Sequence, residues 1–107
     1  MKVQIASSTA SRLRGLAGSG ASSEAIALVP CHDIHTFTMA RPIDVAFVST
    51  AGVVLESHRA VPPMRRLRNR DAAMVLERFA QPGEWFAAGD QIELIAISPV
   101  KEREVST

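Results

Sequence analysis

The segment of residues 31–47, CHDIHTFTMARPIDVAF, gathers the side chains of this sequence that are most able to do chemistry. It holds the single cysteine of the chain, Cys31, and two of the three histidines, His32 and His35, together with Asp44. A cysteine thiolate, a histidine base and an orienting carboxylate form one known catalytic arrangement. Thiolate and imidazole groups are also zinc ligands. The segment therefore raises a nucleophilic hypothesis and a metal-binding hypothesis.

The expected conformation of this segment argues against both hypotheses. Residues 31–39 contain β-branched and aromatic side chains and no glycine, which predicts a strand. In a strand Cys31 and His35 share one face but stand about 13 Å apart, beyond the hydrogen-bond contact that activates a thiol. The same geometry separates the candidate metal ligands, and His58 is the only histidine outside the segment. The sequence thus predicts no metal site and no cofactor.

Ligand recognition is the function that the sequence favours for these residues. We expect His35, Arg41 and Asp44 at the mouth of a shallow polar pocket at one end of the strands, binding a small polar ligand or a protein partner. A small enzyme is one alternative, with His35 as the acid–base group and Asp44 as its orienter. The structural interpretation carries the most weight for His35: His35 and Asp44 satisfy buried backbone groups, while Phe37, Met39 and Phe47 fill the core. Enzymatic activity stays open, and a binding or accessory module is preferred.

The relation between His35 and Asp44 depends on the turn that joins their predicted strands. Alternation along residues 43–49 places Asp44 among apolar side chains, so a buried Asp44 needs a partner. With a two-residue turn, His35 lies diagonal to Asp44, roughly 7–8 Å away and within side-chain reach. With a three-residue turn, His35 lies on the face of the sheet opposite Asp44, because a register shift of one residue moves every side chain to the other face. Pro42 favours the longer turn, since it has no N–H for the ladder.

Five arginines occur in residues 59–70 without an acidic residue among them. They are Arg59, Arg65, Arg66, Arg68 and Arg70. Because arginine binds phosphates and carboxylates through a planar fork, the Arg59–Arg70 segment suggests a third function, binding to an anionic surface or to nucleic acid. No aromatic residue lies between residues 59 and 71 to stack on bases, and the net charge of the chain is only +1. The sequence therefore argues against nucleic acid and favours a solvated loop with Met64 and Leu67 turned inward.

The elements that must position these residues are mostly strands. A chain of 107 residues, 47% of them hydrophobic, suits a single domain over residues 1–107, with a core of about 2–98 and a polar tail over 99–107. Alternation and turn residues predict strands over residues 2–6, 25–30, 31–39, 43–49, 53–61, 72–79 and 91–98. Residues 72–79 also suit a short helix, and short helices are predicted over residues 8–18 and 81–90. Residues 64–71 are predicted to be an exposed loop.

This pattern predicts a mainly β fold of the β-rich α+β kind, a small antiparallel β-sandwich or barrel with one or two short helices. No apolar run approaches the ~20 residues of a membrane helix. The first 18 residues lack the apolar core of a signal peptide. We therefore expect a cytoplasmic protein without membrane contacts.

Several motifs in this order resemble a known family. They are RLRGLAG, PCHDIHTFTMARPIDVAFVSTAGVVLE, VPP, AAMVLE and AAGDQIEL, over residues 12–94. The chain resembles the bacterial and archaeal family called domain of unknown function 192. The resemblance implies a compact, mostly β fold, and it implies no activity, because the family has none established. Some relatives carry other aromatic residues in the histidine region, which argues against His35 as a catalytic requirement of the fold.

Overall fold

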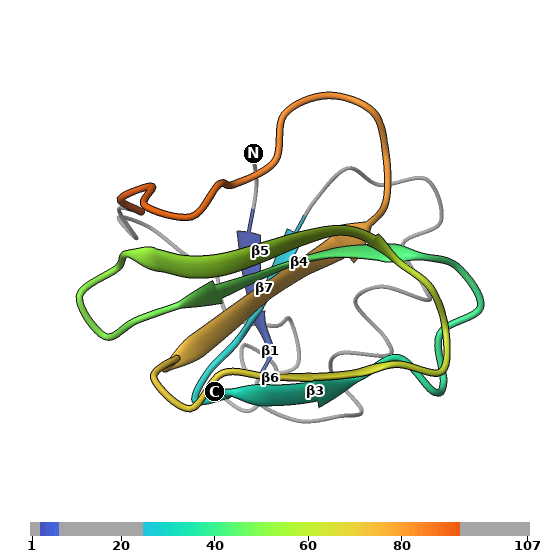
Figure 1. The fold of residues 1–107 in the computed structure, drawn as a ribbon, viewed down its shortest axis with the longest axis horizontal. Coiled ribbons are helices and arrows are strands. Elements are labelled where there is room, and N and C mark those ends of the chain that lie inside the picture. Colours follow the sequence, from blue (N-terminus) through green and yellow to red (C-terminus); the bar gives the residue numbers. More distant parts are fainter. Residues whose placement is uncertain (1–2, 7–24, 93–107) are drawn as a thin grey trace, which may run out of the picture.

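Two sheets, antiparallel except at one edge, form the described part of the molecule (Figure 1). The computed structural model describes residues 3–6 and 25–92. The larger sheet has five strands in the order β1-β2-β7-β4-β5, and the smaller sheet pairs β3 with β6. The strands are β1 Val3–Ala6, β2 Ala25–Leu28, β3 Asp33–His35, β4 Ile43–Val48, β5 Val54–Val61, β6 Arg66–Arg68 and β7 Met74–Phe79. All pairings are antiparallel except the parallel pairing of β1 with β2 at one edge.

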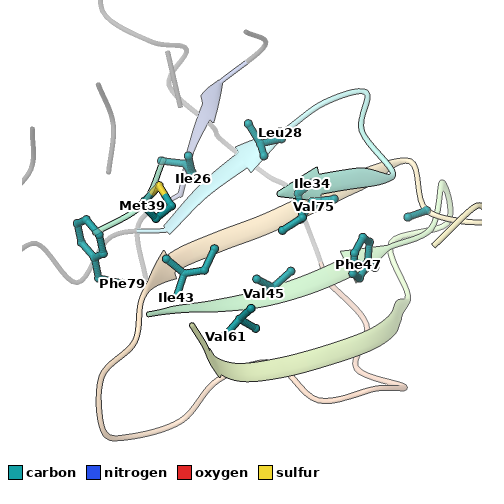
Figure 2. Packing of buried hydrophobic residues seen from close by; sticks show 11 residues of the cluster. Ile26, Leu28, Ile34, Met39, Ile43, Val45, Phe47, Val61, Val75 and Phe79 are labelled. Carbon is teal, nitrogen blue, oxygen red and sulfur yellow. The ribbon is translucent and has the colours of Figure 1, made fainter. Parts of the chain in front are cut away.

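The strands β4 and β7 form the centre of the larger sheet, and every residue in both strands is buried. Side chains alternate along each strand, so the sheet has two covered faces. One face carries the larger apolar cluster, which lies between the two sheets (Figure 2). It consists of Ile26, Leu28, Ile34, Met39, Ile43, Val45, Phe47, Val61, Ala72, Val75 and Phe79.

The opposite face carries a second apolar cluster. Its members are Ala27, Ala46, Val48, Val54, Met74 and Leu76. Trp85, Phe86 and Ile92 pack against it from the segment that follows β7. Two layers therefore cover the central strands, which explains why β4 and β7 read as nearly continuous apolar runs.

The predicted mainly β, antiparallel fold is confirmed. Within the described residues the larger sheet does not close on itself, because β1 and β5 are its two edges. The described residues thus form a sandwich of two sheets and no closed barrel. Residues 72–79, for which a strand and a helix were both considered, form a strand over Met74–Phe79.

The strand predicted over residues 31–39 is wrong in length and in pairing. Only Asp33–His35 is a strand, and it pairs with β6 instead of forming a hairpin with β4. The reason is Thr36, whose backbone and hydroxyl bind the turn at residues 62–65 and end the strand. Residues 64–71 are likewise not only a loop, because they contain β6. Leu67 packs against the larger cluster as predicted, whereas Met64 is 65% exposed and not turned inward.

The predicted helices have different outcomes. The helix predicted over residues 8–18 lies outside the described residues, as do most of the strand predicted over 91–98 and the polar tail over 99–107. Residues 81–90 form no helix. Their backbone instead turns at Gly89, with φ of 95°, and the Asp90 carboxylate accepts the Ala87 N–H at 2.8 Å. Across the described ranges, no helix has the length and apolar character needed to cross a membrane.

Candidate functional site

Asp44 lies in β4 on the face of the larger sheet that points away from β3 and β6, and it is 1% exposed. Its Oδ2 accepts a hydrogen bond from Nε of Arg78 on β7 at 2.8 Å. Its Oδ1 accepts the Ala60 N–H at 2.9 Å and Nε of Arg59 at 3.3 Å. The buried carboxylate therefore has the partners that the sequence required, and they are two arginines and a backbone N–H.

A bulge in β5 produces this arrangement. Ile43 pairs with Val61 and Val45 pairs with His58, so both Arg59 and Ala60 stand opposite Asp44. Ala60 has φ of 53°, a conformation that a residue with a Cβ rarely adopts. The extra residue turns the Ala60 N–H and the Arg59 side chain toward one carboxylate, which is how bulges commonly re-aim side chains.

Arg78 is 3% exposed and lies beneath an aromatic ring. Its Cζ is 4.7 Å from the centre of the Trp85 ring. The Trp85 indole N–H donates to the Val45 carbonyl at 3.3 Å, which holds the ring against the sheet. Arg59 is half exposed and also donates from Nη2 to the Gln81 carbonyl at 2.8 Å. Two guanidinium groups thus share one carboxylate on this face.

His35 lies on the other side of the larger sheet from Asp44. Its neighbour Ile34 packs into the cluster between the sheets, so His35 points outward from β3 and is exposed. Its ring stacks on Phe37 with centres 4.8 Å apart and an interplanar angle of 27°. The structure therefore does not bring His35 and Asp44 together, and both oxygens of Asp44 are already used by other donors.

Arg41 lies on the turn that leads from β3 into β4. Its Cζ is 4.1 Å from the centre of the Phe79 ring, a cation–π contact. β3, β5 and β7 end, and β4 and β6 begin, at this same end of the molecule, on the right in Figure 1. Arg41 and His35 thus belong to one end of the fold.

Cys31 is half-buried, and its thiol donates to the Asp33 carbonyl at 3.5 Å. Its side chain packs against the cluster between the sheets. Over residues 3–6 and 25–92, no group of three or more histidine, cysteine or carboxylate side chains could hold a metal ion. Cys31, His32 and His35 are thus not gathered into a ligand set there.

Two turns at the end of the smaller sheet are joined by Thr36, which is fully buried. Its N–H donates to the Arg65 carbonyl at 2.8 Å, and its own carbonyl accepts the Met64 N–H at 3.3 Å. Its hydroxyl donates to the Pro62 carbonyl at 2.8 Å and accepts the Arg65 N–H at 2.9 Å. These four bonds fix the turn after β3 against the turn before β6.

The joined turns expose two large apolar side chains, Phe37 at 52% and Met64 at 65%. Sequence reasoning missed both, because alternation placed Phe37 in the core and the loop pattern turned Met64 inward. No local signal could have found them. Their exposure follows from the way that Thr36 binds residues 62–65, far along the chain.

The predicted arginine segment divides between the two sides of the molecule. Arg59 joins Asp44, whereas Arg66 and Arg68 lie exposed on β6, opposite His35 and Asp33. Arg66 donates from Nε and Nη2 to the two oxygens of Asp33 at 3.0 and 2.6 Å. These bonds lower the pKa of Asp33 and raise the pKa of Arg66.

A further polar contact ties the two sheets together. The Oε2 atom of Glu56, on β5, lies 2.6 Å from Nε2 of His58. Its Oε1 atom accepts a hydrogen bond from Nδ2 of Asn69 at 2.9 Å. Asn69 directly follows β6. The hydrogen bonds from Asn69 and His58 lower the pKa of Glu56, with a smaller opposing effect of burial. The contact holds the smaller sheet over the larger one, so we assign it a structural role.

The family model of DUF192, described as an uncharacterized ACR, matches residues 1–93. The chain belongs to this family. None of the curated proteins is significantly similar to it in sequence. Among solved structures it is similar to a crystal structure, at 1.22 Å resolution, of a protein of unknown function from Novosphingobium aromaticivorans.

That likeness has a TM-score of 0.59 and 18% sequence identity, over 73% of this chain. The aligned region spans 62% of the other protein's length. At this identity the likeness supports the β fold alone. The DUF192 family and this solved structure thus carry no function over to this chain.

Proposed function

We propose that this chain is a binding module that docks an acidic segment of a protein partner. The binding surface lies at the end of the smaller sheet, and we call it the tip surface. It consists of His35, Phe37, Arg41, Met64 and Arg65. The observation that carries the proposal is the exposure of Phe37 and Met64 on two turns that Thr36 joins.

The apolar part of the tip surface supports binding to a protein. A single exposed apolar side chain is common on protein surfaces and needs no explanation. Here Phe37 and Met64 lie on turns that are hydrogen-bonded to each other, so they are presented together on a rigid backbone. Aromatic, methionine and arginine side chains are the types enriched in protein interfaces. A backbone that is already fixed loses little conformational entropy on binding.

The charge of this part of the molecule supports an acidic partner. Residues 29–41 and 62–71 contain five arginines and two aspartates, a formal charge of +3 in a chain whose total is +1. The rest of the chain is therefore slightly acidic. Such a local excess attracts acidic segments and raises the rate of their association. Because the sequence predicts a cytoplasmic location for this chain, we propose that the partner is also a cytoplasmic protein.

The residues predicted as the ligand site take two different roles in this proposal. His35 and Arg41 contact the partner, since both lie at the end of the fold that carries the tip surface. Asp44 is a positioning residue, because it is 1% exposed and acts through Arg59 and Arg78. Its removal should alter stability more than binding.

Site-specific photo-cross-linking in cells tests the proposal. A photo-reactive phenylalanine analogue replaces Phe37 in one variant and Met64 in another. We expect both to form an adduct with the same protein, and the cross-linked peptide, identified by mass spectrometry, to be acidic. The adduct should disappear when Arg65→Glu is added, because charge reversal repels an acidic segment.

The matched control places the same analogue at Val29, a third exposed apolar residue, at 38%, which precedes β3 at its opposite end. The control should form no adduct with that protein. Absence of an adduct at Phe37 and Met64, or an equal adduct at Val29, would contradict the proposal. Retention of the adduct in the Arg65→Glu background would contradict its charge component.

Binding of single-stranded nucleic acid is a second candidate function, favoured by one observation. The stacked pair of His35 and Phe37 is exposed and lies beside Arg66, the β6 partner of His35. The fold thus supplies the aromatic platform that the arginine segment lacks in the sequence. Fluorescence anisotropy with a labelled oligothymidine tests it. Binding that weakens steeply with salt and with Phe37→Ser would support it, and absence of binding at low salt would exclude it.

A further inference from the structure

The group formed by Asp44, Arg59 and Arg78 carries an unbalanced charge on the face of the larger sheet opposite the smaller one. One carboxylate there accepts hydrogen bonds from two guanidinium groups. The three side chains together have a formal charge of +1. Arg78 is 3% exposed, so part of this excess lies away from water, where an unneutralised charge is costly.

Arg78 also has a donor that the carboxylate does not satisfy. Its Nη2 is buried and has no hydrogen-bond partner in the part of the chain that the structure describes. The Asp44 oxygens are already occupied by Nε of Arg78, Nε of Arg59 and the Ala60 N–H. A buried donor without a partner costs free energy that a suitable acceptor would recover. A further negatively charged acceptor would therefore both bind the Nη2 donor of Arg78 and neutralise the excess positive charge of the group.

We propose that Arg78 and Arg59 form a binding site for a small oxyanion beneath Trp85. The oxyanion is a phosphate or carboxylate group, either of which matches the planar donor pattern of arginine. Arg59 forms the accessible side of the site, because it is half exposed and lies on β5, which is an edge strand among residues 3–6 and 25–92. Trp85 covers Arg78 and belongs to residues 80–90, which contain no helix or strand. Displacement of this segment gives the oxyanion access to Nη2.

The chain contains its own reporter for this site. Trp85 is the single tryptophan, and there is no tyrosine. Its ring centre lies 4.7 Å from Cζ of Arg78, so an anion bound there changes the electrostatic environment of the indole. Anions bound at the tip surface, on the other side of the sheet, would leave this emission unchanged.

The experiment is a titration of Trp85 fluorescence with inorganic phosphate and, separately, with acetate, at constant ionic strength maintained with sodium chloride. We expect a saturable change with at least one of the two. Their relative affinities distinguish a phosphate site from a carboxylate site. Arg78→Lys keeps a cation for Asp44 but lacks the Nη2 donor, and it should weaken binding by at least about tenfold.

The control variant is Arg70→Lys, which makes the same chemical change on an exposed arginine outside both the tip surface and the Asp44 group, and it should bind the oxyanion as the unaltered chain does. Arg59→Lys provides a second test on a half-exposed residue if Arg78→Lys does not fold, as judged by circular dichroism. Absence of a saturable response in the unaltered chain would overturn the proposal. Equal affinity in a folded Arg78→Lys variant, or in Arg59→Lys if Arg78→Lys does not fold, would also overturn it.

Discussion

Hydrogen bonds between Thr36 and Arg65 run from the Thr36 N–H to the Arg65 carbonyl at 2.8 Å and from the Arg65 N–H to the Thr36 hydroxyl at 2.9 Å. The two residues lie 29 positions apart in the chain. Their contact ends β3 and joins the two turns that carry the exposed side chains of Phe37 and Met64. A buried threonine that looks like an ordinary strand residue in the sequence therefore organises the candidate binding surface.

Replacing Thr36 by valine should destabilise the fold. Valine has nearly the same shape but lacks the hydroxyl, which leaves the Pro62 carbonyl and the Arg65 N–H without a partner. We expect a loss of about 1–3 kcal/mol in the free energy of unfolding, measured by urea denaturation. Thr38→Val is the control, because Thr38 is exposed. Equal stability of the two variants would show that the Thr36 hydroxyl is not a structural link.

Replacing Asp44 by asparagine should be more damaging. The change removes the carboxylate that accepts a hydrogen bond from Nε of Arg78, a residue 3% exposed. Breaking a buried ion pair by neutralising one partner typically costs about 3–5 kcal/mol. Asp71→Asn, on an exposed loop, should have little effect. Thermal unfolding of both variants checks this prediction, and a loss below that of Thr36→Val would contradict it.

The Glu56 contact predicts how stability depends on pH. Hydrogen bonds from Asn69 and His58 hold the folded-state pKa of Glu56 below 4.5, its ordinary value. The ionised form is thus favoured by folding, and this stabilisation is fully present above the unfolded-state pKa. It is lost as the pH falls from about 4.5 toward the lower folded-state pKa. Denaturation curves at pH 7 and at pH values below 4.5 measure it.

Glu56→Gln should reduce that acid-side loss of stability, because its side chain does not titrate. Glu84→Gln, on an exposed residue, should leave the pH dependence unchanged. If Glu56→Gln retains the full dependence, then other carboxylates account for it.

Gly52 is predicted to resist substitution for two separate reasons. Its φ is 82°, and an added Cβ would lie 2.7 Å from the Ile92 carbonyl oxygen. Gly83 has φ of 100° but no atom within 4 Å of an added Cβ. Gly83→Ala should therefore cost only the backbone strain, roughly 1–2 kcal/mol. Gly52→Ala should lower the melting temperature by more than Gly83→Ala does. Equal decreases in the two variants would show that the contact with Ile92 relaxes without cost.

The alternation of side chains and the turn residues were sufficient to predict the central strands, β4 and β7. β4 and β7 are continuous apolar runs with one or two charged residues, and such runs are explained by burial on both faces. The burial of Asp44, and its need for a partner, also followed from alternation. The 81–90 segment was harder, because its Pro82 and Gly89 suit either a helical turn or an irregular connection. Packing of Trp85 and Phe86 on the sheet decided for the latter.

The short strand β6 could not be predicted from local pattern. Its three residues, Arg-Leu-Arg, show one alternation and a high charge, which equally describe a loop. It is a strand because β3 lies beside it and because the larger apolar cluster accepts Leu67. The exposure of Phe37 and Met64 has the same origin, since Thr36 finds its partners in another turn.

The sequence by itself determined that the chain is a β protein of the DUF192 family, which strands form its centre, and that Asp44 is buried and paired. Only the tertiary structure decided which residues are the partners of Asp44. Arg59 and Arg78 are 15 and 34 residues from Asp44 along the chain. They meet it because of the strand order β7-β4-β5 and a bulge in β5. Strand order and register depend on long-range pairing, and a shift of one residue would have turned Asp44 to the other face.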